Sequence, residues 1–447
     1  MSEPQLLVVT AGAIAVLVVL IGVLRVNAFL ALTAVSLLTA LAAGIPVGEI
    51  AGVVQAGMGA TLGYIALVIG LGAILGEMLV ASGGARRLAD GLLAWAGPRG
   101  APWALTLLGV LVAVPVFFEV ALLLFIPLVY SLARRSGRSA AYYGLPLAAG
   151  IAVGHAFVPP TPGPVAVAAM LEADLGLVIA VGLAAGLPAA LVAGVWFGRW
   201  AGSRLPEGVP DTVLEEEARA PAQDAPFGAA LMVVLLPLVL ILANTVGKLW
   251  LGEAHPAAAW LALIGHPFSA LLAAAALALW WLGARRGFGR AELQAVADRA
   301  MRPVGMIILL TGAGGAFGKV LVKAGVGDAL VRALDGSGLP VLLFAFLVAA
   351  LLRVAQGSAT VAMVTTAGLL APIVAAADAA PVLRACTVIA IAGGATVLSH
   401  VNDSGFWLVK QLLGLDARQT LFAWTTLETL VGLVGLIGAG LIAVAFA

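Results

Sequence analysis

The sequence predicts an all-α protein that crosses a membrane many times. Hydrophobic residues make up 63% of the chain and charged residues only 10%, whereas charged residues account for about a quarter of a soluble domain. Apolar stretches long enough for a helix to cross the hydrocarbon, which takes roughly 20 residues, recur from residue 5 to residue 447. With no large polar segment among them, the function must lie among the membrane helices.

About ten of these stretches are long enough for a full crossing. They cover residues 5–24, 27–44, 60–81, 140–157, 176–198, 228–250, 257–283, 303–322, 383–398 and 420–446. Two further apolar regions, at 102–131 and 339–377, are too long for one crossing, and each is interrupted near its middle. This pattern predicts a helical hairpin in each region.

Charge and motif content exclude several classes of function. The net charge is +1 and no basic tract is present, so a nucleic-acid partner has no electrostatic support. The single cysteine, Cys386, allows neither an internal disulfide nor a cysteine-built metal cluster. The HExxH and GxSxG patterns are absent, so we expect no resident metal or organic cofactor and no enzyme activity.

The one distinctly polar stretch, residues 202–226, combines prolines with three consecutive glutamates. We interpret it as a flexible linker or short surface helix whose acidic cluster is a solvated face rather than a binding site. With this linker as one segment, we divide the chain into five parts. These are N-terminal helices at 1–59, a first repeat at 60–201, the linker at 202–226, connecting helices at 227–300, and a second repeat at 301–447.

An internal repeat supports this division. "GAILGEMLVASGGARRLADGL" at residue 72 resembles "GAFGKVLVKAGVGDALVRAL" at residue 315, and "GHAFVPPTPGP" precedes "SHVNDSGFW" by nearly the same spacing. If the N-terminus is outside, most basic loops lie on the cytoplasmic side, whereas Lys319, Lys323 and Arg332 lie outside, against the rule. The region 102–131 must then enter and leave from one side, and the repeats have inverted topology, as in many secondary transporters.

Two polar features interrupt the first repeat. Glu119 lies within the first hairpin, where an ionisable group is expensive unless it faces protein or water; it is either a proton-carrying or site-shaping group or a structural carboxylate. Four prolines at residues 159–164, after His155, break the next helix. That break either lines a polar cavity inside the membrane or forms a tight loop outside it.

Two further features interrupt the second repeat. Arg353 precedes a run of small polar residues that suits a hairpin tip, where a helix N-terminus and a guanidinium favour a carboxylate. Small residues alone serve helix packing more often. Arg353 therefore makes a binding site the better interpretation of this segment. His400, Asn402 and Asp403 form the last cluster, which either belongs to the site or merely joins two helices.

Six segments resemble the gluconate permease family, gluconate–proton symporters of the ion transporter superfamily. They are "GYIALVIGLGAILGEMLVASGGARRLAD", "FFEVALLLFIPLVYSLAR", "HAFVPPTPGPVAVA", "GGAFGKVLVKAGVGD", "ALLRVAQGSATVAMVTTAG" and "LSHVNDSGFWLVKQLLGL", in the family's order. The sequence departs from the family's usual pattern at Thr161, where histidine is frequent, and at Gln356, where threonine is frequent.

The resemblance implies proton-driven import of gluconate or a related sugar acid across the bacterial inner membrane. It implies a homodimer in which each subunit has a scaffold domain and a transport domain that moves as an elevator. The implied substrate-binding residues are His155, Thr161, Arg353, Gly357, Ser358, Thr360 and Asn402, and the proton-coupling residues are Glu119, His400 and Asp403.

Other functions remain open at this stage. The alternative is a proton- or sodium-coupled carrier of another small carboxylate or of an amino acid such as D-serine. A channel and an intramembrane enzyme are further, less supported alternatives.

Overall fold

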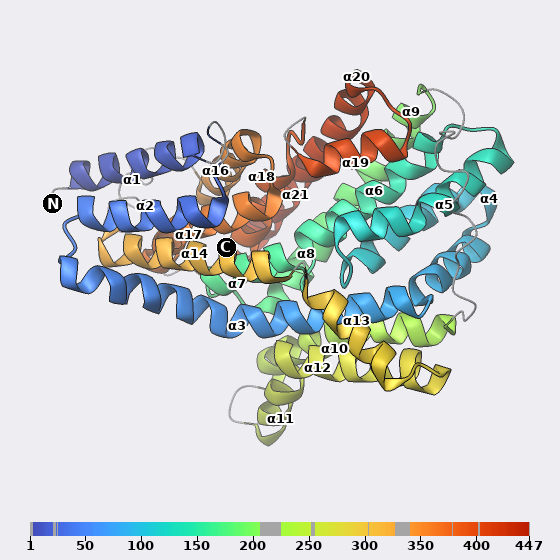
Figure 1. Cartoon of the computed structure of the whole chain (residues 1–447), viewed down its shortest axis with the longest axis horizontal. Helices are drawn as coiled ribbons and strands as arrows, with labels where there is room; N and C mark the ends of the chain where they lie inside the picture. The colour runs from blue at the N-terminus through green and yellow to red at the C-terminus, as the bar shows by residue number, and fades with distance from the viewer. Residues whose placement is uncertain are drawn as a thin grey trace.

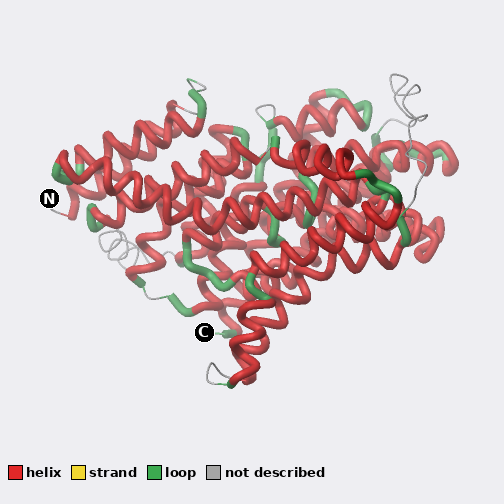
Figure 2. The backbone as a smooth tube through the Cα atoms, turned by 60° about the horizontal axis from the view of Figure 1, so that its bottom comes forward, coloured by secondary structure: helices red, strands yellow, loops and turns green. Residues whose placement is uncertain are grey.

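Helices form all the regular structure in the residues that the computed structural model describes (Figure 2). These residues are 3–20, 24, 26–205, 225–251, 255–302, 304–326, 340–377, 379–400 and 403–446. Within them, seven helical stretches are long and apolar enough to cross a membrane, and five shorter apolar helices accompany them. The chain is therefore a membrane protein with many apolar helices.

The described part of the first half of the chain contains the following helical elements. In order they are α1 (Glu3–Val18), α2 (Ala28–Ala42), α3 (Val47–Ala81), α4 (Gly84–Ala113), α5 (Phe118–Ser136), α6 (Ala140–Phe157), α7 (Pro162–Met170), α8 (Leu175–Ala190), the π-helical turn η2 (Leu191–Gly198) and α9 (Arg199–Gly202). α4 packs along α6 at the right of Figure 1.

Helices of the second half of the chain pack against helices of the first half. In order they are α10 (Phe227–Leu251), α11 (Pro256–Ile264), α12 (Pro267–Leu277), η4 (Ala278–Gly283), η5 (Ala284–Arg286), α13 (Arg290–Met301), α14 (Val304–Lys323), α16 (Val341–Gln356), α17 (Ala359–Ala376), α18 (Pro381–Thr396), α19 (Ser404–Leu412), α20 (Ala417–Thr420), η6 (Leu421–Thr425) and α21 (Thr426–Ala445). α14 packs along α3, and α18 packs along both α16 and α21 (Figure 1).

One predicted boundary falls inside a helix. The sequence separated the N-terminal helices from the first repeat between residues 59 and 60, but α3 runs without interruption from Val47 to Ala81. Pro46 precedes its first turn, where proline is tolerated, and no further proline follows within the helix to stop it. The acidic part of the predicted linker, residues 206–224, lies outside the described residues.

Both regions predicted as hairpins contain a helix break near the middle. Residues 114–117 separate α4 from α5, and Gly357 with Ser358 separates α16 from α17. The first break rests on α3 so closely that a Cβ on Gly76 would lie 1.8 Å from the Pro115 carbonyl oxygen. α16 and α17 pack against each other, so the second region folds back on itself.

Two more breaks occur where the sequence placed its other polar clusters. The prolines after Phe157 end α6, and the chain resumes as α7 with Pro162 in its first turn, a position that needs no amide hydrogen. α18 ends at Thr396, and α19 begins at Ser404.

The outer surface suits a lipid environment. Large apolar side chains are exposed over its helices, and they include several tryptophans, with Trp250 86% and Trp95 81% exposed. Tryptophan is enriched where membrane proteins meet the headgroup region. A few of the buried polar side chains, among them Thr161, Arg353 and Ser399, lie at or next to the helix breaks.

Candidate functional site

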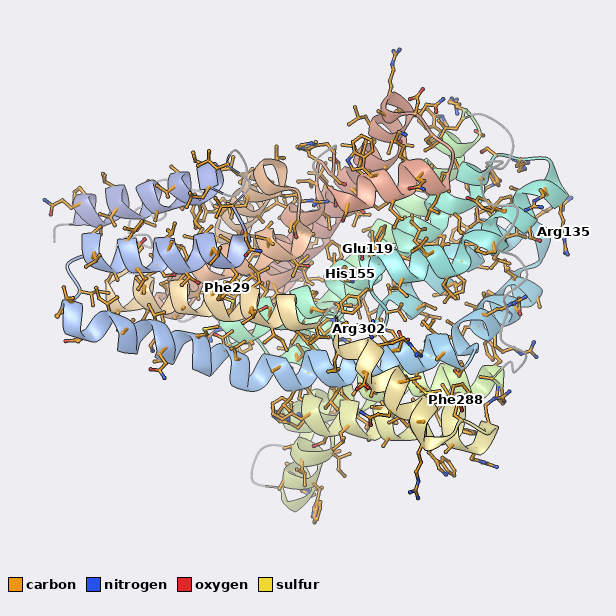
Figure 3. The ribbon with its side chains drawn as sticks, in the orientation of Figure 1. Phe29, Glu119, Arg135, His155, Phe288 and Arg302 are labelled. Atoms are coloured by element: carbon orange, nitrogen blue, oxygen red, sulfur yellow. The ribbon has the colours of Figure 1, made fainter. Side chains whose placement is uncertain are left out.

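The helix breaks meet around one cavity near the middle of the protein, where Glu119 and His155 are labelled in Figure 3. Its volume is about 310 Å³, at the lower end of the roughly 300–1,000 Å³ of small-molecule sites. Its walls come from the starts of α5, α7 and α19, the end of α6, the tip between α16 and α17, and the junction of η6 with α21. Segments far apart in the sequence thus share one site.

Arg353 is the buried cation of this cavity. It lies in the last turn of α16 and is only 3% exposed. Its Nη1 donates to the Gly357 carbonyl oxygen, and its Nη2 lies 2.5 Å from Asp403 Oδ2. Among the described residues, its buried Nε–H has no hydrogen-bond acceptor. The guanidinium therefore holds the hairpin tip and still has a donor to offer.

Asp403 joins this arginine to the break between α18 and α19. Its Oδ1 accepts the Gly405 amide at 3.0 Å and so caps the N-terminus of α19, while its Oδ2 accepts from Arg353 and from the Ser399 hydroxyl. The Ser399 hydroxyl in turn accepts from Trp424 Nε1 at 2.8 Å. This network fixes the second hairpin tip to the broken helix and to η6.

Helix N-termini supply further positive potential. Ser358 caps α17, where its Oγ accepts the Val361 amide at 3.4 Å, and Ser358 and Thr360 both line the cavity, half-buried. The first turns of α5 and α19 also line it. The first amides of a helix have no partner within the helix, and with the helix dipole they favour an anion. The site combines these ends with Arg353, which suits a carboxylate.

Glu119 and His155 line the cavity from the first half of the chain. Glu119 stands exposed in the first turn of α5, and His155 lies in the last turn of α6, half-buried. The two lie close together in Figure 3. The buried Nδ1 of His155 has no hydrogen-bond partner among the described residues. The wall of the cavity that the first half of the chain supplies therefore carries two titratable side chains.

Three other residues predicted for the site are not seen in the cavity wall: two lie outside it, and one is not among the described residues. Thr161 donates to the Val158 carbonyl oxygen at 2.8 Å and lines a narrower pocket beside His155. His400 is not part of the cavity wall; its Nε2 lies 3.1 Å from the Val354 carbonyl oxygen, which ties the break to α16. Asn402 lies outside the described residues.

Glu428 was missed from the sequence. It lies in the first turn of α21, is 4% exposed, and lines the same cavity as Arg353 and Asp403. The signal was available, because Glu428 is an acidic residue inside a predicted crossing, 420–446, and such residues mark functional sites in membrane proteins. Its polar neighbours, Thr425, Thr426 and Thr429, are uncharged, so no cluster of ionisable residues marked the position.

Comparison with known proteins decides the family. A family model described as GntP family permease matches residues 5–445. The chain belongs to this family. Two relatives match nearly the full length: the low-affinity gluconate transporter of Escherichia coli K12 is 39% identical over 99% of both chains, and the gluconate permease of Pseudomonas aeruginosa is 40% identical over 94% of both. This GntP permease is accordingly a transport protein and not an enzyme.

Solved structures of other transporters share the fold. The Alcanivorax borkumensis YdaH transporter superimposes with a TM-score of 0.61 over 90% of both chains at 16% identity. Neisseria gonorrhoeae MtrF, described among antimetabolite efflux pumps, gives 0.59 over 88% of this chain and 83% of its own at 14% identity. At such low identity these matches establish the architecture of this GntP permease alone.

Proposed function

We propose that this protein is a secondary active transporter that imports gluconate or a related sugar acid by proton symport across the bacterial inner membrane. The observation that carries the proposal is the cavity where Arg353 and the N-terminus of α17 converge. A buried guanidinium with an unused donor and a capped helix start recognise a carboxylate. A GntP relative named as an L-idonate transporter, 35% identical over 97% of this chain, supports the wider class of sugar acids.

The substrate would lie with its carboxylate toward Arg353 and the hairpin tip. Ser358 and Thr360 offer hydroxyl groups there, Gly357 keeps the tip free of a side chain, and His155 faces the hydroxylated part of the sugar acid from the opposite wall. Hydroxyl and imidazole groups both donate and accept hydrogen bonds, as a polyhydroxy acid requires. Thr161 supports this wall from its narrower pocket, and Asn402 is proposed as a further contact.

The coupling residues follow from the same arrangement. We propose Glu119, Asp403 and His400 as groups through which the proton is coupled to the substrate. Glu119 has the most open position of the three, at the exposed side of the cavity. Asp403 positions Arg353, and His400 holds the break against α16. A proton that enters beside Glu119 thus meets the site that binds the anion.

We also propose the transport geometry. Two breaks per half, in matching order along the chain, support two inverted repeats, each with a re-entrant hairpin and a broken helix. Under this proposal the hairpins and broken helices form a transport domain that moves as an elevator, while the remaining helices form a scaffold through which two subunits make a homodimer.

Uptake of labelled gluconate into proteoliposomes tests the function. The imposed pH gradient is varied, and the measurement is made with and without sodium. We expect accumulation that follows the inward proton gradient and is indifferent to sodium. Uptake that ignores the proton gradient refutes proton coupling, and absent gluconate uptake beside robust uptake of another acid refutes the substrate.

A further inference from the structure

Glu428 is the buried carboxyl that the predicted site did not include. It is 4% exposed and lines the cavity from α21, in a segment of membrane-spanning length. Among the described residues, its carboxyl makes neither a hydrogen bond nor an ion pair. A buried charge without a partner is costly in a membrane protein, so the protonation of this side chain matters to the site.

The helices packed around α21 bring few other charges to Glu428. Arg353 lies on α16, Asp403 in the break before α19, and His155 on α6. Glu119 lines the same cavity from α5. α8, η2 and η6 carry no charged residue. Arg384, at the far end of α18, is paired with Glu172. Arg353 is thus the cation that matters to Glu428, and Asp403 already holds it.

Close helix packing fixes this position. α21 crosses α18 at two glycines, where a Cβ on Gly432 would lie 2.3 Å from the Gly393 carbonyl oxygen. One helical turn before Gly432, Glu428 therefore faces the break between α18 and α19. The close contact of the two helices holds the backbone of Glu428 at this place beside the cavity.

We propose that Glu428 takes up the proton that is transported together with the sugar acid. This inference rests on the proposed function. The proton binds the Glu428 carboxyl from the outer solution, remains there while the substrate is bound, and leaves to the inner solution with it. Asp403 would contribute to coupling through its ion pair with Arg353 and not by holding the proton. Both of its oxygens already accept hydrogen bonds, so a proton there would displace a donor.

Charge balance explains why proton and anion would move together. The Arg353–Asp403 pair is neutral as a whole, so an ionised Glu428 leaves the empty cavity with one net negative charge from these three groups. Adding the sugar-acid anion and the proton together leaves that charge unchanged. The anion without the proton would place a second negative charge beside the first in a medium of low polarity. The structure therefore favours joint binding.

The test measures gluconate affinity against pH on the purified full-length protein. If only the protonated form binds, the apparent Kd rises about tenfold for each pH unit above the point where Glu428 loses its proton. Glu428→Gln, which mimics the protonated side chain, is expected to bind gluconate with an affinity that no longer changes over that range. In proteoliposomes it is expected to exchange gluconate across the membrane but to lose accumulation driven by the proton gradient.

Glu49→Gln is the matched control, because Glu49 is 51% exposed on α3 and pairs with Lys323 at the surface. It should keep both the pH dependence and the accumulation of the unaltered protein. Proton uptake on addition of gluconate, followed with a pH-indicator dye on the unaltered protein, does not depend on the folding of any variant.

Several outcomes overturn the inference. They are accumulation by Glu428→Gln equal to that of the control, an unchanged pH dependence of its Kd, or no proton uptake by the unaltered protein on binding. Failure of the unaltered protein to bind or transport gluconate would instead refute the proposed function.

Discussion

Replacing Asp403 by asparagine would separate its role as the cap of α19 from its role as the counter-charge of Arg353. Asparagine caps a helix about as well as aspartate, so its Oδ1 can still accept the Gly405 amide at the start of α19. The ion pair with Arg353 is lost, because a neutral amide takes the place of the carboxylate. The variant therefore leaves the cap in place and removes the counter-charge.

The burial of the pair sets the expected cost. The side chains of Arg353 and Asp403 are 4% and 12% exposed, and removing one partner of a buried pair costs about 3–5 kcal/mol, because the other charge stays buried. Asp174→Asn is the matched control. Asp174 also caps a helix, α8, but its side chain is 29% exposed and 3.7 Å from Lys248, and such pairs contribute about 0–1 kcal/mol.

Thermal unfolding in detergent, with and without gluconate, provides the assay. Asp403→Asn should be less stable than Asp174→Asn by about 2 kcal/mol or more. Added gluconate should stabilise Asp403→Asn more than the unaltered protein, because its carboxylate supplies the missing charge to Arg353. A second change, Arg353→Gln, should recover part of the loss, since neither charge of this pair then stays buried.

The reasoning would be refuted by equal stability of Asp403→Asn and Asp174→Asn. It would also be refuted if the losses of Arg353→Gln and Asp403→Asn simply added in the double variant, since residues in one network are expected to couple.

Three further predictions concern the backbone and a surface histidine. Gly357→Ala should weaken gluconate binding and cost about 1–2 kcal/mol of stability, because Gly357 has a φ of 84°, in the left-handed region. Gly432→Ala should lower transport and thermal stability, with an overpacking cost of about 1–3 kcal/mol, whereas Gly440→Ala on the same helix, where a Cβ meets nothing within 4 Å, should change neither. Burial, and then the charge of Lys248, lower the pKa of His266. The folded protein thus disfavours the imidazolium, so the thermal stability should fall as the pH drops through about 6.5, the usual histidine value, and His266→Gln should reduce that dependence; an unchanged pH profile in this variant would contradict the assignment.

Much of the fold could be read from the sequence, because a bilayer imposes simple rules on a chain. Long apolar stretches must be helices, since nothing else satisfies their backbone in lipid. Prolines near residue 160 and small polar residues after Arg353 mark helix breaks, and the structure has breaks at both places. The length of α3 could not be predicted from the sequence. Residues 47–59 mix polar, small and apolar residues, so a continuing helix could not be distinguished from a separate one.

The site could be predicted only in part. Arg353, Ser358 and Thr360 in the second hairpin and Glu119 and His155 in the first half all line the cavity, because each is a polar residue at a helix break. Thr161 and His400 belong to the same breaks, but their side chains bond to nearby carbonyl oxygens and do not line the cavity around Arg353. Spacing along the chain does not specify which way a side chain at a break points.

By itself, the sequence determined that this chain is an apolar helical protein, where its helices break, and which family it resembles. Only the tertiary structure decided that Arg353 is held by Asp403 and that Glu428, from the last helix, lies beside them. The physical reason is distance along the chain. Apolar periodicity and helix-breaking residues act locally, whereas the partner of a buried charge is chosen by how helices from different segments pack.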